Sequence, residues 1–169
     1  TPKGKPTFTF DFGVFMPDDA AAGSNHDTEP NNALAQAQVE KFSPASTGST
    51  NYGFIYGMLD SATDVDVFKF TLPAGTVASS IYFTPSGTGV SGDTTAKSGS
   101  GSTLTFGLVE IADAAGKAIG RLDVTKGSDA MTIPLVPGLE YLVYLNRPAG
   151  SAVGANDFYN LLHVASDTD

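Results

Sequence analysis

The stretch DVDVFKFTL, residues 64–72, has the two-residue period of a β-strand. Phe68 and Phe70 fall on one face of this strand, and Val67 and Lys69 fall on the other. Asp64 and Asp66 precede the two phenylalanines on their own face. The pattern therefore predicts a half-buried strand whose two carboxylates lie at the mouth of an apolar core.

Similar strand-like segments follow one another at short spacing along the rest of the chain, with turn residues between them. These segments are 52–59, 76–85, 104–113, 118–125, 130–136, 139–147 and 156–166. Short strands with frequent turns predict an all-β sandwich with antiparallel sheets. NNALAQAQVE, residues 31–40, is the one stretch that favours a helix, a short one near the N-terminus that begins with Asn31 or Asn32 as its cap.

The two ends of the pattern set the expected domain boundaries. Residues 1–26 are predicted to be a linker or N-terminal extension, with an extra strand at 7–15 where phenylalanines alternate with polar residues. Residues 27–169 are predicted to form the β-sandwich domain. The Gly/Ser/Thr-rich loop at 85–103 has little to bury, so we expect it to be mobile or to serve a function.

Composition excludes several classes of function. The chain has 169 residues, 41% of them hydrophobic, and a formal net charge of −9, which disfavours nucleic acid and anionic membrane surfaces as partners. It contains no cysteine, which excludes disulfides, thiolate zinc sites and a cysteine nucleophile. No run of about 18 apolar residues is present, so no membrane-spanning helix is expected.

Motifs for catalysis are absent from the sequence. It contains no GxSxG, HExxH, P-loop or strand-linked GxGxxG motif. Its two histidines are His26, in a polar segment, and His163, which we expect to be a strand histidine with a hydrogen-bonded ring. A Ser-His-Asp triad depends on geometry rather than on sequence order, and nothing in the sequence favours one. The chain is therefore expected not to be an enzyme.

Two oxygen-rich stretches are the most informative polar features. DTEPNN, residues 27–32, and DSATDVD, residues 60–66, together hold five carboxylates and no basic residue. Carboxylates gathered in this way repel one another unless a cation or a set of N–H groups lies between them. Two alternatives stay open: a Ca²⁺ ion bound by oxygens of both stretches, or hydrogen bonds in which Asp64 or Asp66 accepts N–H groups from 27–32.

EPNNALAQA, GMLDSATDVDVFKFTLPAG and the late strand PGLEYLVYL occur in the order seen in a known family. Over residues 27–165 the chain resembles the bacterial pre-peptidase C-terminal (PPC) domain, which is related to the collagen-binding domains of clostridial collagenases. The resemblance implies a jelly-roll-like β-sandwich that accompanies a secreted enzyme. It also implies structural Ca²⁺, held by Asp27, Glu29, Asn31 and Asn32 on one side and by Asp64 and Asp66 on the other. Asn32 stands where strong calcium binders of the family tend to have Asp.

The resemblance also indicates a tyrosine-bearing ligand surface. Tyr141 is expected to point inward, which leaves Leu142 and Tyr144 outward, so Tyr144 is the first candidate contact and Tyr82 and Tyr159 are the others. We therefore expect a secreted, non-catalytic, monomeric accessory domain of a larger chain. It would bind an insoluble protein, such as collagen, or a polysaccharide. The alternative is a structural or processing module with no ligand of its own.

Overall fold

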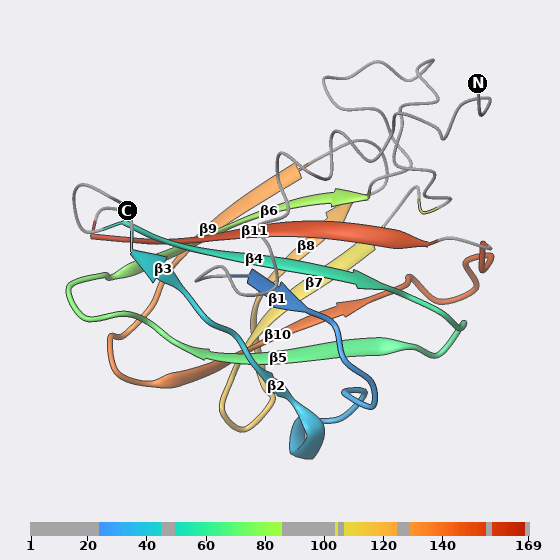
Figure 1. Cartoon of the computed structure of the whole chain (residues 1–169), viewed down its shortest axis with the longest axis horizontal. Helices are drawn as coiled ribbons and strands as arrows, with labels where there is room; N and C mark the ends of the chain where they lie inside the picture. Colours follow the sequence, from blue (N-terminus) through green and yellow to red (C-terminus); the bar gives the residue numbers. More distant parts are fainter. Residues whose placement is uncertain are drawn as a thin grey trace, which may run out of the picture.

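Two β-sheets packed face to face form the protein, as the computed structural model in Figure 1 shows. The structure describes residues 24–44, 50–85, 104, 107–124, 129–154 and 157–167. The strand expected at 7–15 and residues 86–103 of the expected loop lie outside these ranges. The predicted all-β sandwich is confirmed for the described residues.

Within the described residues, sheet A contains six strands in the order β1-β4-β11-β6-β9, with β3 paired to β4 beside β1. Its strands are β1 (Ser24–His26), β3 (Ser43–Pro44), β4 (Asn51–Met58), β6 (Ala78–Pro85), β9 (Asp129–Pro134) and β11 (Phe158–Ser166). Sheet B contains five strands in the order β2-β5-β10-β7-β8. Its strands are β2 (Gln38–Val39), β5 (Val65–Thr71), β7 (Gly107–Asp113), β8 (Ala118–Val124) and β10 (Glu140–Asn146).

Most neighbouring strands pair antiparallel, but both sheets are mixed. The short strands β1 and β2 run parallel to their partners β4 and β5, which the sequence did not predict. Gly116, in the tight turn that links the antiparallel strands β7 and β8, has φ +80°, a conformation that residues with a side chain rarely adopt. The two sheets approach each other along β8 and β9, where Gly120 faces Ile133.

The core lies between the sheets and contains the residues expected from the strand period. Phe68 and Phe70 of β5 are buried there, and they lie opposite Val143 and Tyr141 of β10. Tyr141 therefore points inward as predicted. Leu142 lies on the other face of sheet B, where it forms a smaller buried cluster with Val67 and Ala112.

The predicted helix at 31–40 is wrong, because only a three-residue 3-10 turn, η1 (Leu34–Gln36), occurs there before β2 begins. No residue of η1 is buried, so a longer helix would have no apolar face to bury. The residue before the turn, Ala33, makes no side-chain cap. Among the described residues, no helix is long and apolar enough to cross a lipid bilayer.

β1 lies inside the range 1–26 that was expected to be a linker or N-terminal extension with an extra strand. It pairs with β4 from Ser24↔Phe54 to His26↔Tyr56, so sheet A begins before the expected boundary at residue 27. The side chain of Asn25 holds this edge in place, because it donates to the carbonyl of Lys41 at 3.0 Å and accepts from the Lys41 N–H at 2.6 Å.

Candidate metal centre

The two oxygen-rich stretches meet at one end of β5. The Val65 N–H donates to Asn32 Oδ1 at 2.9 Å, and the Val67 N–H donates to the carbonyl of Asn31 at 3.2 Å. These bonds run in the opposite direction to the hydrogen-bond alternative considered from the sequence, in which Asp64 or Asp66 accepts from segment 27–32. The backbone of β5 thus fixes the position of residues 31 and 32 without using either carboxylate.

Three carboxylates converge where the stretches meet. Asp27, Glu29 and Asp66 each present an oxygen, and these oxygens all lie within 4.8 Å of one another. Asp64 lies nearby and is almost fully buried, with Oδ2 accepting the Asp60 N–H at 2.6 Å. No Lys or Arg side chain is paired with these carboxylates among the described residues.

Asn31 and Asn32 occupy different layers around the carboxylates. Asn31 is buried, and its Nδ2 donates to Asp27 Oδ1 at 2.5 Å. Asn32 is exposed, and its Nδ2 donates to Glu29 Oε2 at 3.1 Å while its oxygen accepts from Val65. The structure therefore brings all six predicted metal residues together, but the side-chain oxygen of Asn32 already accepts a hydrogen bond from the backbone N–H of Val65.

Two buried oxygens in this group lack a hydrogen-bond partner among the described residues: Asn31 Oδ1 and Asp66 Oδ1. A buried oxygen without a partner costs about 1–3 kcal/mol, and more when the group is charged. Because both atoms are acceptors, a bound cation, an added donor or a proton on Asp66 itself would relieve this cost. The donor set is made of oxygen alone, which is the set that Ca²⁺ prefers.

Tyr159 connects the site to the opposite sheet. Its hydroxyl donates to Asp66 Oδ2 at 2.5 Å across the sandwich interior, from β11 of sheet A to β5 of sheet B. Gly57, which pairs with Tyr159 in β4, leaves the room for this side chain, because a Cβ on Gly57 would overlap the Tyr159 hydroxyl. A glycine inside a strand is a sequence signal for such a close approach of another side chain.

Crowding and burial shift the acidities at the site. Burial, with the nearby Asp27 and Asp64 carboxylates, raises the pKa of Asp66 to about 8, against the lowering effect of the Tyr159 hydrogen bond. Burial and the neighbouring Glu29 raise the pKa of Asp27 to about 6. The pKa of Asp64 is also raised, mainly by burial. Without a cation, the folded chain therefore holds protons here that the unfolded chain releases.

We predict that the metal-free protein loses stability as pH rises from about 4 to about 8. The unfolded Asp66 releases its proton near pH 3.8, whereas the folded one keeps it until about pH 8, so folding is favoured below this window and penalised progressively through it. Urea unfolding in chelator across this range measures the effect. Asparagine cannot ionise, so the free energy of unfolding of Asp66→Asn should rise relative to that of the wild type as pH increases. Parallel curves of unfolding free energy against pH for the two proteins would contradict the prediction.

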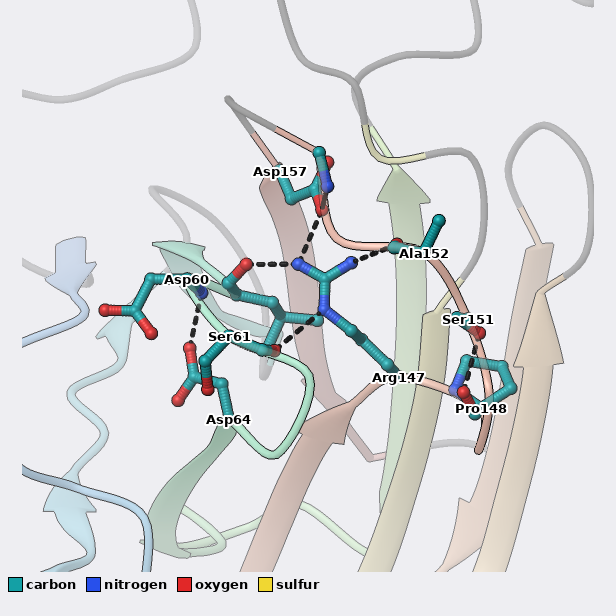
Figure 2. Close-up of polar contacts among 10 residues, drawn as sticks. Asp60, Ser61, Asp64, Arg147, Pro148, Ser151, Ala152 and Asp157 are labelled. Carbon is teal, nitrogen blue, oxygen red and sulfur yellow. Dashed lines mark hydrogen bonds and ion pairs between the residues drawn. The ribbon is translucent and has the colours of Figure 1, made fainter.

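Arg147 fixes the loop that carries Asp60 and Asp64, as Figure 2 shows. Its guanidinium donates to the carbonyls of Leu59 and Ser61 on one side and to that of Ala152 on the other. It also pairs with Asp157 at 2.5 Å, and both side chains are only 2% exposed. The loop borders an open hollow lined by Glu29, Asn32, Asp60, Ser61, Thr63 and Asp64. Arg147 thus sets the position of one wall of the site.

The three candidate ligand tyrosines lie in different places. Tyr159 is 1% exposed and is bonded to Asp66, so it is a core residue and its assignment as a ligand contact is wrong. Tyr82 is 47% exposed on sheet A. Tyr144 is half-buried on the outer face of sheet B, opposite Glu110 in β7. The sequence could not separate these cases, because each tyrosine lies in an ordinary strand.

A buried Ser-His-Glu arrangement is a feature that the sequence did not predict. Ser79 Oγ lies 2.5 Å from His163 Nε2, and His163 Nδ1 lies 2.9 Å from Glu40 Oε2. These contacts match the order of a hydrolytic triad. All three residues are buried, so a substrate has no approach to Ser79 in this arrangement. The expected strand histidine with a hydrogen-bonded ring is confirmed.

Comparisons with known proteins return structural neighbours only. No protein-family model matches the chain, and no curated protein matches it. One similar solved structure is the pre-peptidase C-terminal domain of a collagenase from Bacillus anthracis, at 10% identity and a TM-score of 0.37, covering 88% of this chain and 98% of that one. Another is a periplasmic inhibitor of g-type lysozyme from Aeromonas hydrophila, at 14% identity and a TM-score of 0.38, covering 84% and 97%.

Proposed function

We propose that this chain is a calcium-stabilised, non-catalytic β-sandwich domain that attaches a secreted parent enzyme to an insoluble polymer. The single observation that carries the calcium part is the pair of buried acceptors, Asn31 Oδ1 and Asp66 Oδ1, beside three converging carboxylates. A cation at this point would give both atoms a partner. It would also offset the repulsion among Asp27, Glu29 and Asp66.

The chemistry of the donor set favours Ca²⁺ over other ions. Ca²⁺ takes six to eight oxygen ligands in flexible arrangements, whereas Mg²⁺ requires near-octahedral geometry and usually keeps several waters. Zinc prefers nitrogen and sulfur ligands, and none lies in the cluster. Asp27, Glu29 and Asp66 would supply carboxylate oxygens and Asn31 its amide oxygen. Asp64 is close enough to contribute, and Asn32 would act by orienting Glu29.

The described residues offer little support for catalysis. The one arrangement with catalytic order, Ser79-His163-Glu40, is closed within the core. The described hollow beside the candidate metal centre is open and is lined by acidic, hydroxyl and amide side chains. These oxygen-bearing residues are explained more simply as the wall of a cation site than as a catalytic site. A hydrolytic activity of the isolated chain on an ester, peptide or glycoside would overturn the non-catalytic assignment.

Calcium binding is tested by thermal unfolding with calcium and with chelator. At free calcium about 100 times the dissociation constant, binding stabilises the folded state by about 2.7 kcal/mol. In a chain of this size, that raises the midpoint by roughly 5–10 °C. We expect Asp66→Asn to remove most of this rise, because it loses one carboxylate and one of the two unpaired acceptors.

Asp123→Asn is the matched control for the calcium experiment. Asp123 is an exposed carboxylate on β8, paired with Arg121 and remote from the cluster. This variant should keep the full calcium response. A wild-type midpoint that is the same in calcium and in chelator would remove the calcium proposal, whatever the variants do.

Polymer attachment is the finer part of the proposal. Support comes from accessible aromatic side chains on both sheets, since aromatic anchors contribute most of the affinity at many interfaces. Tyr82 and Tyr144 remain the candidates, and they lie on opposite sheets. Retention on insoluble collagen, chitin or cellulose would support attachment. Failure on every polymer, with a normal calcium response, would favour the structural or processing module instead.

A further inference from the structure

We infer that the outer face of sheet A, the side turned away from the core, binds an uncharged polysaccharide. This inference rests on the proposed polymer-attachment role and narrows it to one face and one ligand class. The face is built from alternate residues of neighbouring strands. Ile55, Ile81 and Leu161 point into the core, which turns their sequence neighbours outward.

Aromatic and aliphatic side chains form rows across this face. Phe54, Leu162 and Tyr82 lie in register on β4, β11 and β6. Tyr52 and Val164 form the neighbouring row. Phe54 and Tyr82 lie on either side of β11. Because adjacent strands are about 4.8 Å apart, the Cα atoms of these two residues are roughly 10 Å apart. Tyr82 is 47% exposed and Tyr52 is 36% exposed, so rings at both edges of the patch are accessible to a ligand.

The described side chains of this face carry no Asp, Glu, Lys or Arg, although the chain holds 18 acidic and 9 basic residues. The face includes His26, Tyr52, Phe54, Tyr56, Met58, Ser80, Tyr82, Ala130, Thr132, Pro134, Phe158, Asn160, Leu162 and Val164. Tyr56 is only 3% exposed, so the accessible aromatic rings are those of Tyr52 and Tyr82. In a protein of net charge −9, a face whose described side chains include no acidic or basic group is suited to an uncharged partner.

The outer face of sheet B differs and provides an internal comparison. Its charged residues are Lys69, Glu110, Arg121, Asp123 and Glu140. Arg121 lies 3.8 Å from Glu110 and 3.1 Å from Asp123. Tyr144 lies beside Glu110, and burial together with this carboxylate raises its pKa. Of the two accessible candidates, Tyr82 therefore lies on the uncharged face and Tyr144 on the charged one.

The chemistry of the sheet A face fits a sugar polymer. Pyranose rings present flat C–H faces that pack on aromatic rings, and their hydroxyls exchange hydrogen bonds with small polar side chains. Ser80 and Thr132, whose hydroxyl oxygens lie 2.9 Å apart, supply such groups beside the aromatic rows. A charged partner would have to lose hydration here without meeting an opposite charge, which is unfavourable. The rows run across a sheet rather than into a pocket, as an extended chain requires.

The test is retention of the whole chain, in calcium, on insoluble cellulose and chitin. The wild type should bind at least one of them, and binding should change little between low and high salt because no charge pair is involved. Tyr52→Ala combined with Tyr82→Ala should weaken binding by roughly tenfold or more, as expected when anchors are lost. Ile119→Ala, which removes a 43% exposed apolar side chain from β8 of sheet B, is the matched control and should bind like the wild type, while Tyr144→Ala decides between the two candidate faces. Unfolding midpoints verify that each variant is folded.

Three outcomes would overturn the inference. They are no retention on either glycan, retention on collagen alone, and loss of glycan binding in Tyr144→Ala but not in the sheet A double variant. The calcium response of the midpoint is read separately on the same samples. A normal calcium response without glycan binding would therefore reject this face while leaving the calcium-stabilised domain in place.

Discussion

Replacing His163 with alanine is expected to destabilise the fold by about 3–5 kcal/mol, the range expected when a buried carboxyl group loses its partner. Glu40 would then remain buried without the imidazole that it contacts at 2.9 Å. The Ser79 hydroxyl would lose its ring partner as well. Phe42 and Phe70, whose rings pack edge-on against His163, would border a cavity. Urea unfolding at neutral pH measures the loss.

Glu40→Gln serves as the companion variant, because it keeps the shape of the side chain and replaces the carboxyl group with an amide. We expect a smaller loss than for His163→Ala. In a double-mutant cycle with Glu40→Ala, the two alanine substitutions should be strongly non-additive, with a coupling of about 1 kcal/mol or more. Additive effects would show that the contact between Glu40 and His163 does not contribute to stability.

Replacing Arg147 with alanine is the second large effect, and we expect a loss of about 3–5 kcal/mol. The substitution leaves the Asp157 carboxylate buried and removes the donor to three backbone carbonyls. Since two of these carbonyls belong to the loop before Asp64, the calcium response of the midpoint should also shrink. Thermal unfolding with and without calcium measures both results.

Arg121→Ala is the matched control for Arg147→Ala, because it removes an arginine that pairs with a carboxylate at the surface. Exposed ion pairs contribute little to stability, so its midpoint and its calcium response should stay close to those of the wild type. Equal losses for the two arginine variants would refute the structural role assigned to Arg147. Arg147→Lys should recover only part of the stability, since lysine lacks the planar fork of donors.

Much of the fold was predictable because strand period and turn residues are local signals. The segment 64–72 contains β5 (Val65–Thr71), and 139–147 contains β10 (Glu140–Asn146), with Phe68, Phe70 and Tyr141 inward as their alternation predicts. The helix at 31–40 failed because propensity is a weak signal in a segment without an apolar face. Its asparagines bond to Asp27, Glu29 and β5 instead of capping a helix.

The candidate metal centre was only partly predictable. The six residues could be named from their composition and from the family resemblance, but sequence did not reveal that Asn31 and Asp66 each keep a buried oxygen without a partner. Nor did it reveal that Tyr159 reaches Asp66 from the other sheet, which removes it from the ligand surface. Burial and partner identity depend on which strands pack against each other, and no local pattern encodes that.

The sequence by itself determined the all-β character, the inward residues of β5 and β10 and the gathering of acidic residues in two stretches. These properties follow from side-chain alternation and composition, which act over a few residues. Only the tertiary structure decided which oxygens are buried together and that His163 joins Ser79 to Glu40. It also decided that the described side chains on the outer face of sheet A are uncharged, whereas that of sheet B carries charged ones. The physical reason is that desolvation and pairing are set by contacts between residues far apart in the chain, such as the 93 residues that separate Asp66 from Tyr159.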